Sequence, residues 1–188
     1  MTYDKLDNDE LLRIALDALN QDLHAEAVSM LKTLVERDSN HVFGTYLLAA
    51  EHMQLGMVDR AEAGFRRTVE LAPDFPMARF QLGQLYLVKG DAESARAVLA
   101  PVAALPENMA LGHYAKGLIA AANEDADHAI AELQAGLACE QDVPAMTADM
   151  QRVLDNLRAL QGGGQPAPTM PTGNAAPLYL SNYGKPVG

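Results

Sequence analysis

Residues 76–109 read PMARFQLGQLYLVKGDAESARAVLAPVAALPENM, and this stretch decides the fold. It opens on Pro76 and reaches Pro106 close to its end, and both prolines separate it from its neighbours. Apolar residues recur on both sides of Gly90 at the spacing of amphipathic helices. Glycine supplies the permissive backbone that a tight turn needs. The stretch therefore predicts two helices joined by a turn at Gly90.

The same arrangement recurs every 34 residues along the chain. Three columns of residues share this period: a small residue in the second helix, a small residue in the first helix, and a large apolar residue in the second helix. A fixed period of this length marks a repeat architecture, and the small residues let the paired helices approach closely. The columns are Ala27, Ala61, Ala95 and Ala129; Ala15, Ala49, Gly83 and Gly117; and Leu31, Phe65, Leu99 and Leu133.

These residues resemble the tetratricopeptide repeat (TPR) family over about Asn8 to Gln141. The best match is the third repeat, which carries Leu82, Gly83, Tyr86, Gly90, Asp91, Ala95 and Leu99 in the family order. The outer repeats depart from the pattern, since they have Ala18 and Ala120 in place of the family tyrosine. The resemblance implies an all-α fold, a right-handed superhelix of four TPR hairpins at about 8–41, 42–75, 76–109 and 110–143.

Two further segments follow the repeats. Pro144 stands where a fifth repeat would begin, but Gln151 occupies the small-residue column, so residues 144–161 are predicted to form a C-terminal capping helix. Its apolar stripe is Met146, Met150, Val153, Leu154, Leu157 and Leu160. Residues 162–188 form a tail rich in glycine and proline, which cannot bury a core. Within the tail, an apolar docking segment is predicted at 177–186.

The resemblance also implies where a partner would bind. In this family the second, fifth, ninth, twelfth and thirteenth positions of each repeat form a concave groove. Here those positions are mostly large and apolar, which suits a peptide with apolar or aromatic anchors. Core packing is the alternative for each of these side chains, because apolar helical stripes usually are core. The candidate groove residues are Leu12, Leu16, Phe43, Tyr46, Met53, Met77, Phe80, Leu87, Tyr114 and Leu118.

Some family members bind acidic C-termini through a clamp of lysine, arginine and asparagine on the concave columns. The matching positions here hold Leu12, Leu16, Leu47 and Ala50. An acidic tail is therefore an unsuitable ligand. The chain's own tail is a candidate instead, docking in the groove in cis or in trans through Leu178, Tyr179, Leu180 and Tyr183. A disordered tail with chance aromatic residues is the alternative.

Charge and composition exclude other classes of function. The net charge is −11, and the single lysine of residues 162–188 leaves −12 on the preceding residues. Nucleic acid is an unsuitable partner, because its affinity rests on cationic side chains. No apolar run approaches the roughly 20 residues of a membrane-spanning helix, so no membrane insertion is expected. The acidic start of the chain lacks the basic, then apolar, pattern of a secretory signal, which predicts a cytoplasmic location.

The remaining polar residues indicate no catalytic or metal site. The five histidines show no close pairing of the kind that metal ligands favour, and Arg66 and Arg67 are predicted on a solvated outer face. Neither a nucleophile motif nor a phosphate-binding glycine loop is present in the sequence. We therefore expect no enzyme and no cofactor, but a protein-binding adaptor. The alternatives are a secretion-type chaperone for export substrates and a structural module that self-associates, for example as a homodimer.

Overall fold

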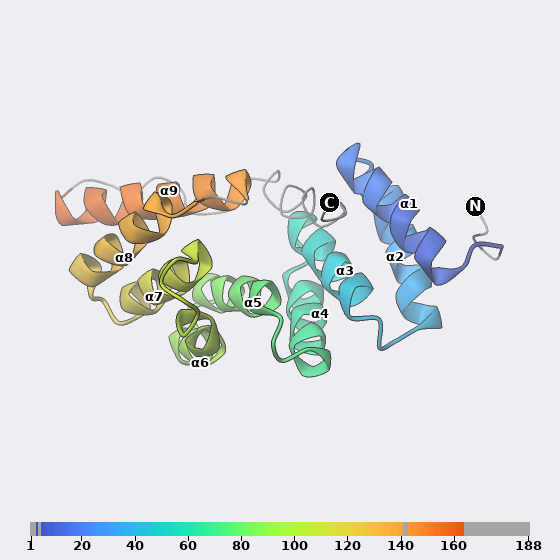
Figure 1. Ribbon diagram of the computed structural model, residues 1–188, viewed down its shortest axis with the longest axis horizontal. Coiled ribbons are helices and arrows are strands. Elements are labelled where there is room, and N and C mark those ends of the chain that lie inside the picture. Colours follow the sequence, from blue (N-terminus) through green and yellow to red (C-terminus); the bar gives the residue numbers. More distant parts are fainter. Residues whose placement is uncertain (1–2, 4, 141–142, 164–188) are drawn as a thin grey trace. The chain divides into compact units, whose positions relative to one another are not determined.

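The computed structural model describes residues 3, 5–140 and 143–163. Over these residues the chain forms nine α-helices and no strand (Figure 1). This confirms the predicted all-α class. The helices are α1 (Asn8–Asn20), α2 (His24–Arg37), α3 (Val42–Gln54), α4 (Val58–Leu71), α5 (Pro76–Val88), α6 (Ala92–Ala103), α7 (Ala110–Ala122), α8 (Ala126–Ala138) and α9 (Pro144–Gln161).

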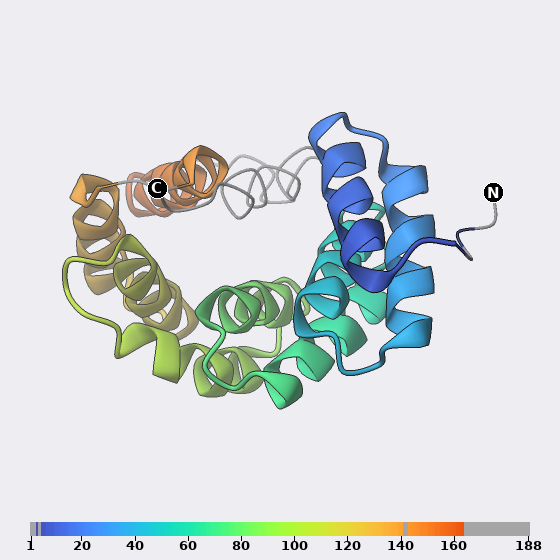
Figure 2. The ribbon, with the colours of Figure 1, turned by 45° about the vertical axis from the view of Figure 1, so that its right-hand side comes forward.

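The chain divides between Phe75 and Pro76 into two compact units. In the first unit α1 packs on α2 and α3 packs on α4, and α2 also contacts α3. In the second unit the pairs are α5 with α6 and α7 with α8, while α6 contacts α7 and α8 contacts α9. Figure 2 shows the antiparallel course of α1 and α2, the two blue helices. Each unit is therefore built from the helical hairpins that the 34-residue period predicts.

All four hairpins turn in the same way. The second residue after each first helix ends has a positive φ: 57° at Asp22, 69° at Gly56, 76° at Gly90 and 60° at Glu124. In the first turn the amide of Asp22 donates to the carbonyl of Leu19 at 3.1 Å, and the next amide donates to Ala18 at 2.9 Å. The other three turns repeat both bonds. This pair of bonds closes a helix on a left-handed residue, which is usually glycine.

The three periodic columns form the contact between the helices of each hairpin. Every residue of these columns is buried. A Cβ atom added at Gly83 would lie only 2.4 Å from Cγ of Leu99, and one at Gly117 would lie 2.9 Å from Cγ of Leu133. The glycines are therefore needed because the large side chain of the second helix occupies the space that their own side chain would fill.

The second helices begin in two different ways. In the second unit, the Asp91 side chain accepts a hydrogen bond from the amide of Ser94 (3.0 Å), and Asp125 does the same for α8. In the first unit, the same column holds Leu23 and Met57, which provide no side-chain cap. Such a cap typically stabilises a helix by about 1 kcal/mol. The first unit therefore forgoes this stabilisation at both of its second helices.

Helix α9 ends the described part of the chain. Pro144 lies in its first turn, where the missing amide hydrogen is not needed. The helix packs on α8, and Nε2 of Gln161 donates to Oδ1 of Asp127 at 2.8 Å. The predicted apolar stripe is wrong at Leu160, which is 55% exposed. The buried members of the stripe are Met146, Met150 and Leu154.

The contact between α2 and α3 contains a buried carboxylate. Glu51 on α3 has a side chain that is 0% exposed, and its Oε2 lies 2.8 Å from Nδ1 of His24 on α2. Its Oε1 has no hydrogen-bond partner among the described residues. Burial raises the pKa of Glu51, and the bond with His24 offsets only part of that effect. The matching positions in the second unit hold the apolar residues Ala92 and Ile119. The free-energy cost of burying a carboxylate between these helices therefore arises only in the first unit.

The first prediction concerns the turn at Glu124. A non-glycine residue at positive φ costs roughly 1 kcal/mol, so Glu124→Gly is expected to raise the free energy of unfolding by about 0.5 to 1 kcal/mol. Chemical denaturation followed by circular dichroism measures this. Gly90→Ala is the matched control in the same unit: nothing lies within 4 Å of the added Cβ, so backbone strain alone should lower stability. A destabilised Glu124→Gly variant would contradict the strain argument.

The second prediction concerns Glu51. The pKa of Glu51 is higher in the folded chain than in the unfolded chain. Protonated Glu51 therefore contributes stability in full when the pH is below its pKa in the unfolded chain, and this stability is lost as the pH rises through its pKa in the folded chain. Glu51→Gln carries no charge, so its stability relative to the native chain should increase as pH rises from 4.5 toward neutral. Urea denaturation at several pH values measures the difference.

Glu132→Gln is the control with the opposite sign. The pKa of Glu132 is lowered in the folded chain. Its ionised side chain therefore contributes stability when the pH is above its pKa in the unfolded chain, and this stability is lost as the pH falls through its pKa in the folded chain. Relative to the native chain, this variant should therefore lose stability as pH rises toward neutral. Equal pH profiles for Glu51→Gln and the native chain would show that burial of the carboxylate costs nothing.

Candidate functional site

The three aromatic candidate groove residues of the fifth column lie inside the hairpins, while the fourth member, Leu12, is half-buried. Tyr46 is 0% exposed, and Phe80 and Tyr114 are each 1% exposed. The ring centroid of Tyr46 lies 6.0 Å from that of Phe65 and 4.8 Å from that of Phe75. The prediction that Tyr46, Phe80 and Tyr114 line an open surface is therefore wrong. The first helices are apolar on more than one side, so sequence pattern alone does not tell which apolar stripe is covered.

The ring of Tyr114 packs against a glycine in the second unit. A Cβ atom at Gly136 on α8 would come within 2.6 Å of Cε1 of Tyr114. The ring thus rests directly on the backbone of the second helix, as a core residue does. A ligand could reach Tyr46 or Tyr114 only if the hairpins opened.

Two more of the predicted groove residues are buried, and the rest are partly accessible. Met77 and Leu118 are 8% and 5% exposed. The half-buried members are Leu12, Leu16, Phe43, Met53 and Leu87. The first four of these belong to α1 and α3, so most of the accessible members of the predicted set lie in the first unit. Whether these residues bind a partner stays a prediction.

The absence of a cationic clamp has a structural counterpart. Of the four positions that would hold it, Leu47 and Ala50 are buried at 0% and 1% exposure, while Leu12 and Leu16 are half-buried. The accessible part of these positions is therefore hydrocarbon. It offers no charge to a carboxylate ligand.

Gln54 is a polar residue of the same surface that the sequence prediction did not include. It is half-buried at the end of α3, next to Met53, and its Nε2 atom has no hydrogen-bond partner within the described residues. A buried amide hydrogen without a partner costs free energy, and a peptide carbonyl is a suitable acceptor. Its place in the thirteenth column, one of the columns that form the concave groove in the TPR family, is the sequence feature that could have identified it.

His52 is buried beside this surface but belongs to the core. It is 8% exposed, and its Nε2 atom has no partner among the residues described. Burial lowers the pKa of His52, and the positive charges of Lys32 and Arg60 lower it further. A histidine held neutral in this way cannot supply positive charge to an acidic ligand.

His113 has a structural role in the second unit. Its Nδ1 lies 2.7 Å from Oε2 of Glu132 on α8, and its Nε2 lies 2.8 Å from the carbonyl of Glu107. Burial raises the pKa of Glu132, but the bond from His113, the charge of Lys116 and the bond from His128 outweigh it and hold the pKa below its ordinary value. These contacts tie α7 to α8 and to the preceding loop.

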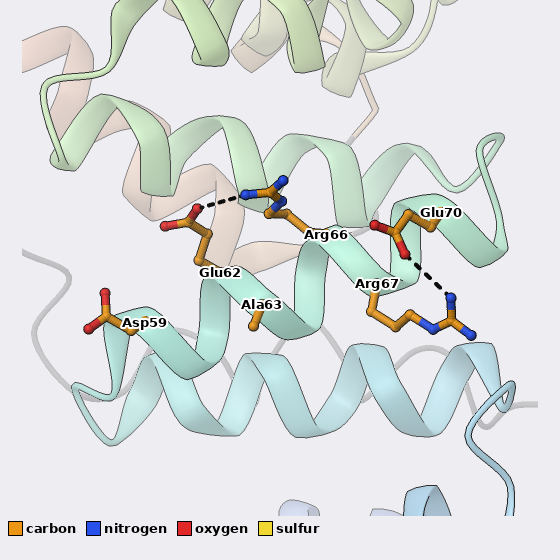
Figure 3. Close-up of a pocket in the computed structure, with 6 residues that line it drawn as sticks. All are labelled: Asp59, Glu62, Ala63, Arg66, Arg67 and Glu70. Carbon is orange, nitrogen blue, oxygen red and sulfur yellow. Dashed lines mark hydrogen bonds and ion pairs between the residues drawn. The ribbon is translucent and has the colours of Figure 1, made fainter.

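A hollow of about 470 Å³ lies over the outer face of α4, and Figure 3 shows the side chains that line it. Arg66 pairs with Glu62 at 3.6 Å, and Arg67 pairs with Glu70 at 3.3 Å. Both arginines are exposed, which confirms the predicted outer face. Its lining consists of five charged side chains and one alanine, with both arginines paired to carboxylates. The lining residues are Asp59, Glu62, Ala63, Arg66, Arg67 and Glu70.

No group of three or more histidine, cysteine, aspartate or glutamate side chains in residues 3, 5–140 and 143–163 could hold a metal ion. Over the same residues, none of the helices has the length and apolar character required to cross a bilayer. The accessible apolar residues of the first helices therefore remain the strongest candidate site.

Comparison with known proteins gives a fold but no close relative. No protein-family model matches the sequence, and no curated protein matches it. Among solved structures, TTC0263, a thermophilic TPR protein in Thermus thermophilus, is 23% identical, with 84% of each chain covered and a TM-score of 0.66.

Structures of MamA are also similar. MamA from Desulfovibrio magneticus RS-1, from residue 41 to its end, is 23% identical over 84% of this chain and 87% of that one, with a TM-score of 0.64. Another crystal structure of MamA is 18% identical over 70% of this chain and 77% of that one, with a TM-score of 0.60. Together with the 34-residue period, these likenesses show that the chain has a TPR-like, all-α helical-repeat fold.

Proposed function

We propose that this protein is a non-catalytic scaffold that holds an apolar or aromatic peptide segment of a partner protein against its first helices. The observation that carries the proposal is the partial accessibility of four apolar side chains on α1 and α3. Leu12, Leu16, Phe43 and Met53 stay half-buried although the hairpin cores are already filled by other residues. Accessible apolar surface, where it is contiguous, usually marks an interaction site.

The composition of this surface favours a peptide ligand. Methionine and leucine adapt to irregular apolar partners, and Phe43 adds a flat ring. These apolar side chains would provide the affinity for the bound segment.

Charge restricts the ligand further. Residues 1–161 carry −12, and the accessible clamp positions are leucines, so acidic peptides are disfavoured. The chain's own tail has suitable chemistry, because it holds Leu178, Tyr179, Leu180 and Tyr183 and no acidic side chain. It lies outside the described residues. It can act as a ligand in cis or in trans, and a chain that binds its own tail in trans would form a homodimer. The cytoplasmic location stays a prediction.

Selection from a displayed library of short random peptides tests the proposal on the full chain. Selected peptides should be enriched in leucine, phenylalanine and tyrosine relative to the unselected library. A Leu16→Ser/Met53→Ser variant should bind them about tenfold or more weakly, because two apolar contacts of roughly 1 kcal/mol each are lost. Fluorescence polarisation with the selected peptides measures this, and circular dichroism establishes that the variant is folded.

Arg66→Ala, on the outer face of α4, is the matched control and should bind like the native chain. If the selection shows no apolar enrichment, or if the Leu16→Ser/Met53→Ser variant binds normally, the first helices are not the binding surface. Loss of binding in Arg66→Ala would place the site on α4 instead.

A further inference from the structure

An apolar edge lies at the hairpin turns of the first unit, whereas the turns of the second unit carry one large, exposed apolar residue, Val88. Leu23, Leu55 and Met57 are 43%, 47% and 41% exposed, and we call these three residues the turn edge. They account for half of the large, exposed apolar residues in the described part of the chain. In the second unit, the positions matching Leu55 hold Lys89 and Asn123, and those matching Leu23 and Met57 hold Asp91 and Asp125.

The backbone does not require apolar residues at this edge. The φ and ψ angles are −86° and 61° at Leu23 and −84° and 62° at Met57. They are −89° and 76° at Asp91 and −90° and 79° at Asp125, where aspartate caps the helix. An aspartate would therefore fit at Leu23 and Met57 and would stabilise α2 and α4. Both α2 and α4 lack the stabilisation of a side-chain cap and instead begin at an exposed apolar residue. This exchange of stability for exposed apolar surface indicates a binding role.

Local contacts bring the members of the edge together. His24, next to Leu23, lies 2.8 Å from Glu51, four residues before Leu55. Only Gly56 separates Leu55 from Met57, and the Sδ atom of Met57 accepts a contact from Arg60 at 3.8 Å. The contact between His24 and Glu51 therefore places the beginning of α2 beside the last turn of α3, within a single unit.

We propose that the turn edge binds the C-terminal segment Leu178–Tyr183 of this chain. The size of the edge fits a short peptide, because three side chains are too few for a stable interface between folded proteins. Charge also fits: exposed Asp22, Glu26 and Asp59 surround the edge, while the tail holds Lys185 and no acidic residue. The proposal rests on the role of the protein as a scaffold for apolar segments, but it uses a surface other than the first helices.

The length of the tail permits such docking. Residues 164–177 separate the last described residue from this segment, and an extended chain of that length spans roughly 45 to 50 Å. A tether also raises the local concentration of the segment to the order of millimolar, so weak docking is populated. Docking would cover the apolar edge in the absence of a partner.

Photo-crosslinking of the full chain tests the proposal. With benzoylphenylalanine in place of Tyr179, cross-links should map by mass spectrometry to peptides that contain Leu23 or Leu55–Met57. A mixture of isotope-labelled and unlabelled chains distinguishes docking in cis from docking in trans, and either origin supports the proposal. Cross-links to Leu12, Leu16 or Met53, or to no defined site, would overturn it.

The variant Leu23→Asp/Met57→Asp gives a second readout. It should reduce the cross-link at least fivefold while raising the melting temperature by roughly 3 to 8 °C, because two helix caps are gained. A folding defect cannot produce both changes. Leu160→Ser, at another exposed apolar position, should leave the cross-link unchanged.

The two proposals fail separately. If Leu23→Asp/Met57→Asp keeps the cross-link, the turn edge is not the docking site, whatever the selected peptides do. If the cross-link is lost as expected but no displayed peptide binds the first helices, the tail site stands and the proposed partner site falls.

Discussion

The close approach of the two helices in each hairpin is the constraint on which the rest of the structure depends. Cγ of Leu99 would lie 2.4 Å from any Cβ at Gly83, and Leu133 and Gly117 repeat this contact. Because such cores are close-packed, the small residues fix the distance between the paired helices. The turn that follows each first helix must then reverse the chain within a few residues. The same pair of backbone bonds achieves this in all four hairpins.

Filling the hairpins determines what remains accessible. The rings of Tyr46 and Tyr114 are buried in their own hairpins, so they add to the core rather than to a binding surface. What the first unit leaves accessible is less aromatic: Leu12, Leu16, Phe43 and Met53 on the first helices, and the turn edge at its hairpin turns. Polar groups within the fold act structurally, as His113 does between Glu107 and Glu132.

The period, the fold class and the packing columns could be predicted from sequence, because small residues at a 34-residue spacing have one physical explanation. Which faces of the first helices stay accessible could not be predicted from the sequence. Tyr46 and Phe43 lie three residues apart on one apolar helix. The sequence does not show that Phe65 and Phe75 cover the ring of Tyr46, while the ring of Phe43 stays partly accessible. The buried Glu51 was also missed, since its burial depends on how α2 meets α3. Two further signals are present in the sequence: the contrast between Leu23 or Met57 and Asp91 or Asp125, and the place of Gln54 in the thirteenth column.

The central claim is that the accessible apolar side chains of α1 and α3 form the partner-binding surface. Hydrogen–deuterium exchange of the full chain, with and without a saturating apolar peptide chosen by display, tests it most directly. The account predicts slower exchange in α1 and α3 and unchanged exchange in α4. Slowing confined to α4, or no change in any helix on peptide binding, would contradict it.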